Sequence, residues 1–369
     1  MILTRGARIT GAVLCAVLAA LVAAWIVRDV RALGDPADLL RYWAGYTRGW
    51  PRTLPATLQA DPVLFVVLVA ALIAALRSPV AASTLVVTGL VTLALRLPGV
   101  WTIGSSWMGE RYSDELRTRA LVGTFVALAA GLALVVIGSV GRRQPEDSYE
   151  PRPTRPGRGA GVTAFLLLGA SGAVMIAWEI RQLFTLPDEL YPAWFTGGKV
   201  LTIGLTATPP GWSGVAIGVI CLVVAWTALF RAVHARPLGM IVAGLLLVSG
   251  GCGIARTVHD ASLQHFGDAP LEQQLIMLTS FLFALAGAVT LPVLARRGFE
   301  RVEGQDGQGV QGYGGYGYPP ADTPGYGYPR PGAAPGYGYP QSGGPGYGYP
   351  QSRGGPGSPP PPASPPPGW

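Results

Sequence analysis

Apolar segments long enough to cross a lipid bilayer fill most of the first 295 residues. A transmembrane helix needs about 20 predominantly apolar residues to cross a hydrocarbon core about 30 Å thick. Half of the residues are hydrophobic and only 13% are charged, whereas ordinary soluble domains carry roughly 25% charged residues. The sequence therefore predicts an all-α membrane protein.

The polar, apolar-poor stretch at residues 141–158 divides these segments into two blocks of four and of nearly equal length. The blocks share landmarks in the same order: Trp25 and Arg28 correspond to Trp178 and Arg181, Arg77 to Arg236, Arg96 to Arg256, and Arg142 with Arg143 to Arg296 with Arg297. We therefore predict eight transmembrane helices arranged as a duplicated 4+4 bundle. Its parts are a first repeat at 1–140, a cytoplasmic linker at 141–158, a second repeat at 159–298 and a disordered tail at 299–369. The alternative is eight helices whose ends simply share the Trp and Arg that favour the membrane interface.

The first apolar segment, Ile9–Val27, follows two arginines and fits either a signal peptide or a first transmembrane helix. Its counterpart in the second block, Gly161–Ile180, lies in the middle of the chain and cannot be a signal peptide. The duplication therefore favours a retained helix.

Between the first two spans, Asp35 and Pro36 predict the start of a short helix rich in Tyr and Trp, which favour the headgroup region. The next apolar run, Pro62–Leu76, is short for a span, so we expect its helix either to begin before Asp61 or to pair with a tilted neighbour. A tight hairpin then leads to Pro79–Leu95, and a loop at 96–119 precedes the span Ala120–Val140.

The distribution of arginine predicts the orientation. With the N-terminus inside, the short inner segments up to Arg301 hold 13 basic residues, and the much longer outer loops hold 12 basic and 13 acidic residues. Basic residues in short loops mark the cytoplasmic side. The 26 Arg against a single Lys, Lys199, are typical of a high-GC bacterium. We expect a bacterial cell-membrane protein with both termini in the cytoplasm.

The last seventy residues change in composition. The hexapeptide PGYGYP recurs at Pro324, Pro335 and Pro345, and 9 of the 14 tyrosines lie in this tail. Such a segment has too few aliphatic residues to form a core, which predicts disorder with polyproline II character. It is either a solvated spacer or an arm that binds a cytoplasmic partner or itself. In composition the tail resembles those of many uncharacterised actinobacterial multi-pass membrane proteins, a likeness that implies no activity or site.

The chain offers little for catalysis, metal or nucleotide. His259, Asp260, His265 and Asp268 share one loop but match no metal-ligand spacing. The segment FTGGKVL, 195–201, lacks the first Gly and the final Ser or Thr of a phosphate-binding loop. The basic residues stand singly, which argues against nucleic acid. Cys15, Cys221 and Cys252 lie in apolar segments and form no ligand pattern. We expect no enzyme and no cofactor.

Inside the spans no carboxylate, His or Arg lies near the middle, where a coupled transporter usually keeps one. Glu179, at the outer end of its span beside Arg181, is expected either to pair locally with that arginine or simply to be exposed at the interface. We interpret Thr84, Thr88 and Thr92 as helix-packing residues, together with the GxxxG of Gly214 and Gly218.

Two functions stay open. The first is a non-enzymatic scaffold or accessory factor with a partner-binding tail, and the second is an uncoupled permease or lipid-handling protein built from two parallel repeats. An axis along the membrane normal would bring four arginines to one outer mouth: Arg28, Arg96, Arg181 and Arg256. Because guanidinium groups bind phosphate in a bidentate manner, they could hold an anionic lipid headgroup. Arginines that flank spans also simply reach the interface without a specific ligand. Membrane lipids are thus the expected partners, and the sequence leaves the oligomeric state open.

Overall fold

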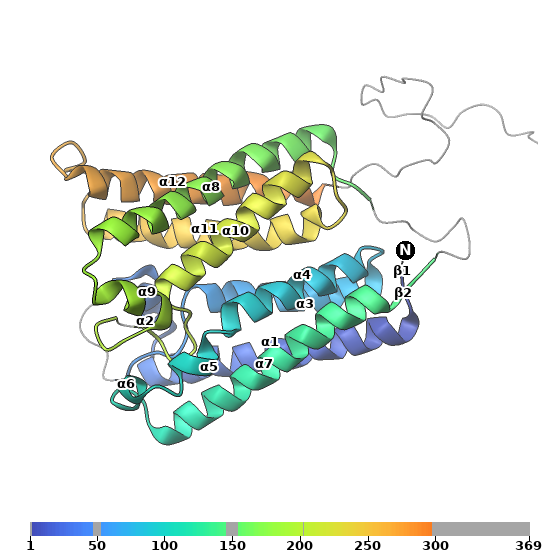
Figure 1. Ribbon diagram of the computed structural model, residues 1–369, viewed down its shortest axis with the longest axis horizontal. Helices are drawn as coiled ribbons and strands as arrows, with labels where there is room; N and C mark the ends of the chain where they lie inside the picture. The colour runs from blue at the N-terminus through green and yellow to red at the C-terminus, as the bar shows by residue number, and fades with distance from the viewer. Residues whose placement is uncertain (1, 47–52, 145–153, 202, 297–369) are drawn as a thin grey trace, which may run out of the picture. The chain divides into compact units, whose positions relative to one another are not determined.

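A computed structural model of the chain describes residues 2–46, 53–144, 154–201 and 203–296. The tail at 299–369 and most of the linker lie outside the described residues. The described part is almost entirely helical (Figure 1), and its elements are β1 (Ile2–Leu3), α1 (Arg5–Leu33), α2 (Pro36–Ala44), α3 (Ala60–Arg77), α4 (Ala81–Arg96), α5 (Gly99–Thr102), α6 (Ser106–Gly109), α7 (Asp114–Val140), β2 (Arg142–Arg143), α8 (Arg158–Thr185), α9 (Leu190–Thr196), α10 (Pro210–Leu229), α11 (Ala235–His259) and α12 (Leu271–Ala295).

Eight helices of the described residues are long and apolar enough to cross a membrane, as the sequence predicts. They are α1, α3, α4 continued by α5, α7, α8, α10, α11 and α12. The expected helix start at Asp35 is confirmed, because its side chain accepts a hydrogen bond from the amide of Ala37 at 2.8 Å and caps α2. The expectation that α3 begins before Asp61 is also confirmed, since its first residue is Ala60.

Two helix bounds differ from the sequence prediction. The first span is longer than Ile9–Val27, because α1 continues through Arg28 and Asp29 to Leu33 and ends at Gly34, which has a φ of 81°. The expected loop at 96–119 is mostly helical: it holds α5 and α6, and α7 already begins at Asp114.

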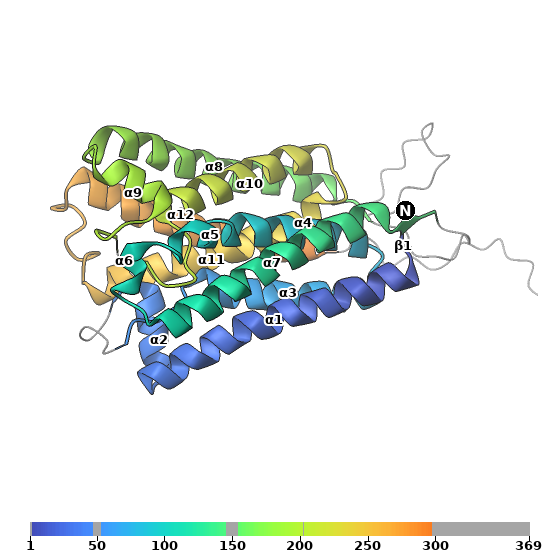
Figure 2. The same ribbon diagram turned by 60° about the horizontal axis from the view of Figure 1, so that its bottom comes forward.

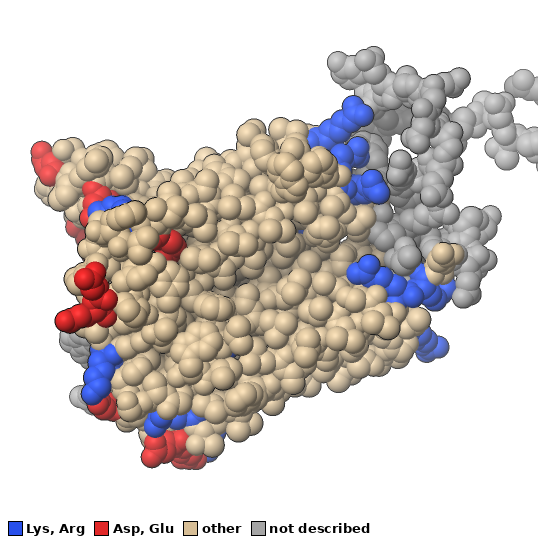
Figure 3. Space-filling view, in the orientation of Figure 1, with Lys and Arg blue, Asp and Glu red and all other residues tan. Residues whose placement is uncertain are grey.

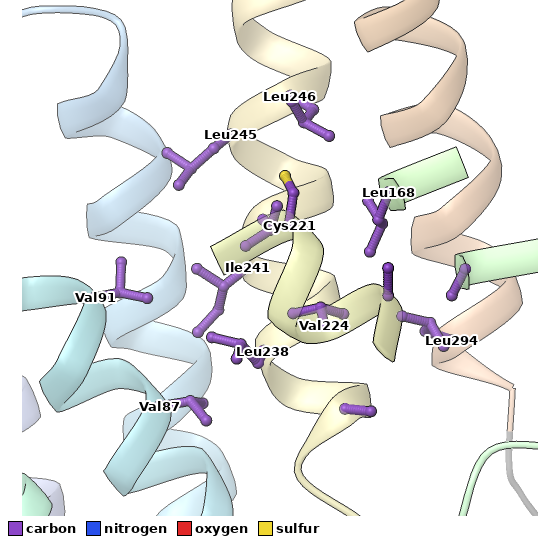
Figure 4. Close-up of a cluster of buried hydrophobic side chains, with 14 of the residues drawn as sticks. Val87, Val91, Leu168, Cys221, Val224, Leu238, Ile241, Leu245, Leu246 and Leu294 are labelled. Carbon is purple, nitrogen blue, oxygen red and sulfur yellow. The ribbon is translucent and has the colours of Figure 1, made fainter. Parts of the chain in front are cut away.

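The helices form two sets of four. In the first set, α1 packs mainly on α3 and α4 packs mainly on α7; in the second set, α8 packs on α10 and α11 packs on α12. The first set has its own apolar core, whose fully buried members include Cys15, Leu68 and Leu85. The second core extends into the first set, and Figure 4 shows Val87 and Val91 of α4 beside Ile241 of α11. The sets therefore meet through α3, α4 and α11.

Small residues allow the closest helix approaches. A Cβ on Gly89 of α4 would lie 2.5 Å from the carbonyl oxygen of Gly131 in α7. Gly218 of α10 contacts Met175 and Ile176 of α8, which confirms the packing role expected for it.

Charge is divided between the two ends of the helices (Figure 3). At the end that carries the N-terminus, β1 pairs with β2, and the charged residues described there, such as Arg5, Arg77 and Arg236, are all basic. All Asp and Glu among the described residues lie at or near the opposite end. We call these the basic end and the acidic end; helices α2, α5, α6 and α9 are at the acidic end (Figure 2).

Candidate functional site

A buried carboxylate organises the acidic end of the first set. Asp29 of α1 is fully buried, and its Oδ1 accepts from Nη1 of Arg28 at 2.7 Å and from the amide of Ala56 at 3.1 Å. Its Oδ2 accepts from the amide and the hydroxyl of Thr57, at 2.8 and 2.6 Å. Burying a charge is costly unless it is fully hydrogen-bonded. These four donors meet that requirement and fix the loop at residues 56–57 on α1.

A second carboxylate extends this network to the other set of helices. Asp61, 4% exposed, forms an ion pair with Arg96 and accepts from the amide of Leu58 at 2.8 Å. Arg96 also donates to the carbonyl of Thr206, at 2.9 Å. The amide and the hydroxyl of Thr206 both donate to the carbonyl of Ala56, each at 3.0 Å. We call Asp29, Thr57, Asp61, Arg96 and Thr206 the loop network.

Two tyrosines beside the loop network have raised pKa values. Burial is the largest cause of the raised pKa of Tyr112, with Tyr42 and Asp29 adding to it. Burial likewise raises the pKa of Tyr42, assisted by Asp29 and opposed by Arg111. The Tyr112 hydroxyl donates to the carbonyl of Pro55 at 2.9 Å. A raised pKa keeps this phenol protonated, so that it remains a donor.

The acidic end also contains a pocket of about 280 Å³, which we call the acidic-end pocket. Its walls come from α8, α11 and α12, with one residue from α9 and one that precedes α3. The lining residues are Gln59, Trp178, Glu179, Gln182, Trp194, Ser249, Gly253, Arg256, Glu272, Ile276, Thr279, Ser280 and Phe283.

The pocket lining is charged at the ends of α11 and α12 and becomes less polar towards the middle of these helices. Arg256 and Glu272 lie in the last turn of α11 and the first turn of α12. At a rise of about 1.5 Å per residue, Ser249 lies about 10.5 Å from Arg256 along α11 and Phe283 lies about 16.5 Å from Glu272 along α12, close to the middle of these 25-residue helices. The pocket thus has a charged end near the termini of α11 and α12 and a deeper part that includes an aromatic ring.

Hydrogen bonds hold the polar side chains of the pocket in place. The indole N–H of Trp194 donates to Oε2 of Glu179 at 2.9 Å, and that of Trp178 donates to the hydroxyl of Thr279 at 3.1 Å. Glu272 receives two hydrogen bonds from Arg181, at 3.0 and 2.8 Å. The charge of Glu272 is therefore already balanced within the protein.

Arg256 is the basic residue of the pocket lining. Its side chain is exposed and packs against Gly45, the residue that ends α2 with a φ of 82°. Nearby, Tyr46 stacks on His259 with ring centroids 4.3 Å apart. Arg256 makes no hydrogen bond or ion pair with another residue in the ranges that the structure covers. Its guanidinium donors are thus available to a ligand.

The structure places the four arginines of the predicted ring at the acidic end, but does not bring Arg28 and Arg181 face to face. Their helices, α1 and α8, lie on opposite sides of the two sets (Figure 1). The reason is that α3, α4 and α11 occupy the contact between the sets. Arg28, Arg96 and Arg181 each pair with a carboxylate, of Asp29, Asp61 and Glu272 respectively.

One further expectation from the sequence changes. Glu179 does not pair with Arg181, because Trp194 of α9 reaches Glu179 while Glu272 takes Arg181. His259, the last residue of α11, stacks on Tyr46, and its Nδ1 lies 3.0 Å from Oδ1 of Asp260. Within the described residues, no group of three or more His, Cys, Asp or Glu is placed to hold a metal ion.

Sequence reasoning missed Asp29, Asp61 and the pocket. A usable signal existed for Asp61, since it and Arg96 stand at the same ends of two consecutive antiparallel spans with opposite charges. No comparable signal marks Asp29, because its partners include two backbone amides.

Comparisons with protein-family models, with curated proteins and with solved structures find no match. The class of protein is therefore defined by the fold alone: a multi-pass α-helical membrane protein.

Proposed function

We propose that this membrane protein is a non-enzymatic lipid-handling protein that binds the polar head of an amphiphile in the acidic-end pocket. The observation that carries the proposal is the gradient in the pocket, from Arg256 and Glu272 at the charged end to Phe283 about 16.5 Å further along α12. A lipid shows the same order of polarity, from its charged headgroup to the first apolar carbons of its acyl chain. Ligand pockets commonly begin at about 300 Å³, so a volume near 280 Å³ suits a headgroup rather than a whole lipid.

The proposed orientation places the acidic end outside the cell. The charged residues described at the basic end are all arginine, and arginine in short loops favours the cytoplasmic side. The pocket would then face the outer leaflet of the cell membrane, and the linker and tail would lie in the cytoplasm.

Duplication of a four-helix unit is part of the proposal. It is supported by the similar order of helix neighbours in the two sets and by the short helices α2 and α9, which follow α1 and α8 at the same end. The pocket occurs in the second set, with Gln59 as its contribution from the first.

A permease in which the two sets rock at the acidic end fits less well. All hydrogen bonds between the sets, among the described residues, lie at that end. They include the indole of Trp212 to the carbonyl of Ala94 at 2.8 Å and Arg111 to the carbonyl of Leu201 at 2.7 Å. Each contributes about 1 kcal/mol, so separating the sets there would cost several such bonds. The scaffold hypothesis rests on the tail, which lies outside the described residues.

Native mass spectrometry of the full chain in a mild detergent tests the proposal. We expect one lipid to remain bound through mild delipidation, and Arg256→Gln to lower its retention about tenfold, because a charge-assisted hydrogen bond is worth about 1.5–3 kcal/mol. Arg119→Gln is the matched control, since Arg119 is an exposed arginine of the same end that does not line the pocket. Equal retention in the two variants, or no retained lipid in the unmodified protein, would refute lipid handling by this pocket.

A further inference from the structure

Glu179 has hydrogen-bonding capacity that the protein does not use. Its Oε2 is held by Trp194, and its Oε1 lies against Gly214 of α10. Within the described residues no donor reaches Oε1, and the neighbouring Arg181 is engaged by Glu272. A half-buried carboxylate with one free oxygen favours a donor that also carries positive charge.

The aromatic side chains around Glu179 add to the preference for a cation. Trp178 and Trp194 line the same pocket, and their indole N–H groups are engaged, so both rings are held in place. Tryptophan faces attract cations within about 6 Å. The protein already uses Trp178 in this way, since the guanidinium carbon of Arg181 lies 5.4 Å from its ring centroid.

One negative and one positive side chain of the pocket have no partner of opposite charge among the residues that the structure describes, so the pocket can bind one positive and one negative ligand group. Arg181 balances Glu272, so the charges without an internal partner are those of Glu179 and Arg256. A purely anionic head would satisfy Arg256 but would bring negative charge towards two carboxylates. A head with both charges satisfies Arg256 and Glu179 together.

We infer that the acidic-end pocket selects a zwitterionic head, in which an ammonium group contacts Glu179 between Trp178 and Trp194 and a phosphate contacts Arg256. This inference rests on the proposed function and names the class of its ligand. The same chemistry occurs in a phospholipid and in a soluble phosphate ester of an amino alcohol. The apolar side chains of Ile276 and Phe283, deeper in the pocket, favour the phospholipid.

Calorimetric titration of the full chain in a non-ionic detergent tests the inference with three probes. Dihexanoyl phosphatidylethanolamine carries both charges, dihexanoyl phosphatidylglycerol carries only the phosphate, and glycerophosphoethanolamine has the zwitterionic head without acyl chains. We expect the first probe to bind about tenfold more tightly than the second, the size of effect that one charge-assisted contact provides.

Glu179→Gln should abolish this preference and leave binding of phosphatidylglycerol unchanged or tighter. The variant keeps an acceptor for Trp194, and an unchanged thermal midpoint would show that it folds. Glu189→Gln is the control, since Glu189 is exposed at the same end and does not line the pocket.

The outcomes separate the two proposals. Equal or tighter binding of phosphatidylglycerol by the unmodified protein would overturn the zwitterion inference and leave lipid handling intact. Binding of neither lipid would overturn the proposed function itself. If glycerophosphoethanolamine binds as tightly as the lipid, head selection holds, but the ligand is a soluble solute and the lipid assignment is wrong.

Discussion

At the scale of single residues, the structure of the acidic end depends on buried carboxylates. Asp29 accepts four hydrogen bonds, and Asp61 joins Arg96 to the amide of Leu58. A buried ion pair adds little net stability compared with apolar residues of similar size, but removing one partner leaves the other charge buried without compensation. The loop network is therefore sensitive to single substitutions.

We predict that Asp29→Asn lowers the free energy of unfolding by about 3 kcal/mol, in the range seen when one partner of a buried pair is lost. Each oxygen of Asp29 accepts two hydrogen bonds. In asparagine one of these oxygens becomes an NH₂ group, which is itself a donor and cannot accept hydrogen bonds from the two donors that face it. Thermal unfolding in detergent, followed by loss of the monodisperse protein, measures the change.

Asp38→Asn provides the control for this measurement. Asp38 pairs with Arg41 on the surface of α2, and its side chain is 46% exposed. Exposed ion pairs contribute about 0–1 kcal/mol. Similar midpoints for the two variants would mean that the burial of Asp29 does not stabilise the protein.

At the scale of helices, backbone proximity decides which side chains fit. Gly250 and Gly251 are neighbours in α11 and differ in their surroundings. A Cβ at position 250 would collide with the amide nitrogen of Ala284 and lie 2.6 Å from the carbonyl oxygen of Ser280, both in the backbone of α12. A Cβ at position 251 would have nothing within 4 Å.

We predict that Gly250→Ala destabilises the protein by about 1–3 kcal/mol, the usual cost of overpacking, while Gly251→Ala has no destabilising effect. The pair controls for helix propensity, since both changes replace glycine by alanine in the same helix. Thermal midpoints of the two variants, measured side by side, test the contact between α11 and α12. An equal decrease of the thermal midpoint in both variants would show that α11 and α12 do not approach each other so closely at Gly250.

Sequence reasoning succeeded for the helices because their signals are local. Span length, the cap at Asp35 and the early start of α3 all follow from neighbouring residues. It failed for Asp29, since an acidic residue after Val27 normally marks the end of a buried span. The helix continues because amides of residues 56 and 57, distant in the chain, satisfy that carboxylate. The pocket was missed for the same reason, because its walls come from four helices and one loop residue.

At the scale of the whole molecule, charge and hydrogen bonding distinguish the two ends. The described residues of the basic end carry only positive charge, and hydrogen bonds between the two sets occur at the acidic end. In the proposed orientation the basic end lies in the cytoplasm, and the pocket would then lie on the side of the outer leaflet, as its proposed ligand requires. We therefore expect the lining of the acidic-end pocket to be accessible from outside the cell.

Labelling of intact cells with a membrane-impermeant thiol reagent tests this claim most directly. The native cysteines Cys15, Cys221 and Cys252 are first replaced by alanine, and Gln182→Cys then places one thiol at the pocket. His234→Cys, at the basic end next to α11, is the control. We expect Gln182→Cys to react in intact cells and His234→Cys to react only after the membrane is permeabilised. The reverse pattern would contradict the orientation and, with it, the binding of an outer-leaflet head by this pocket.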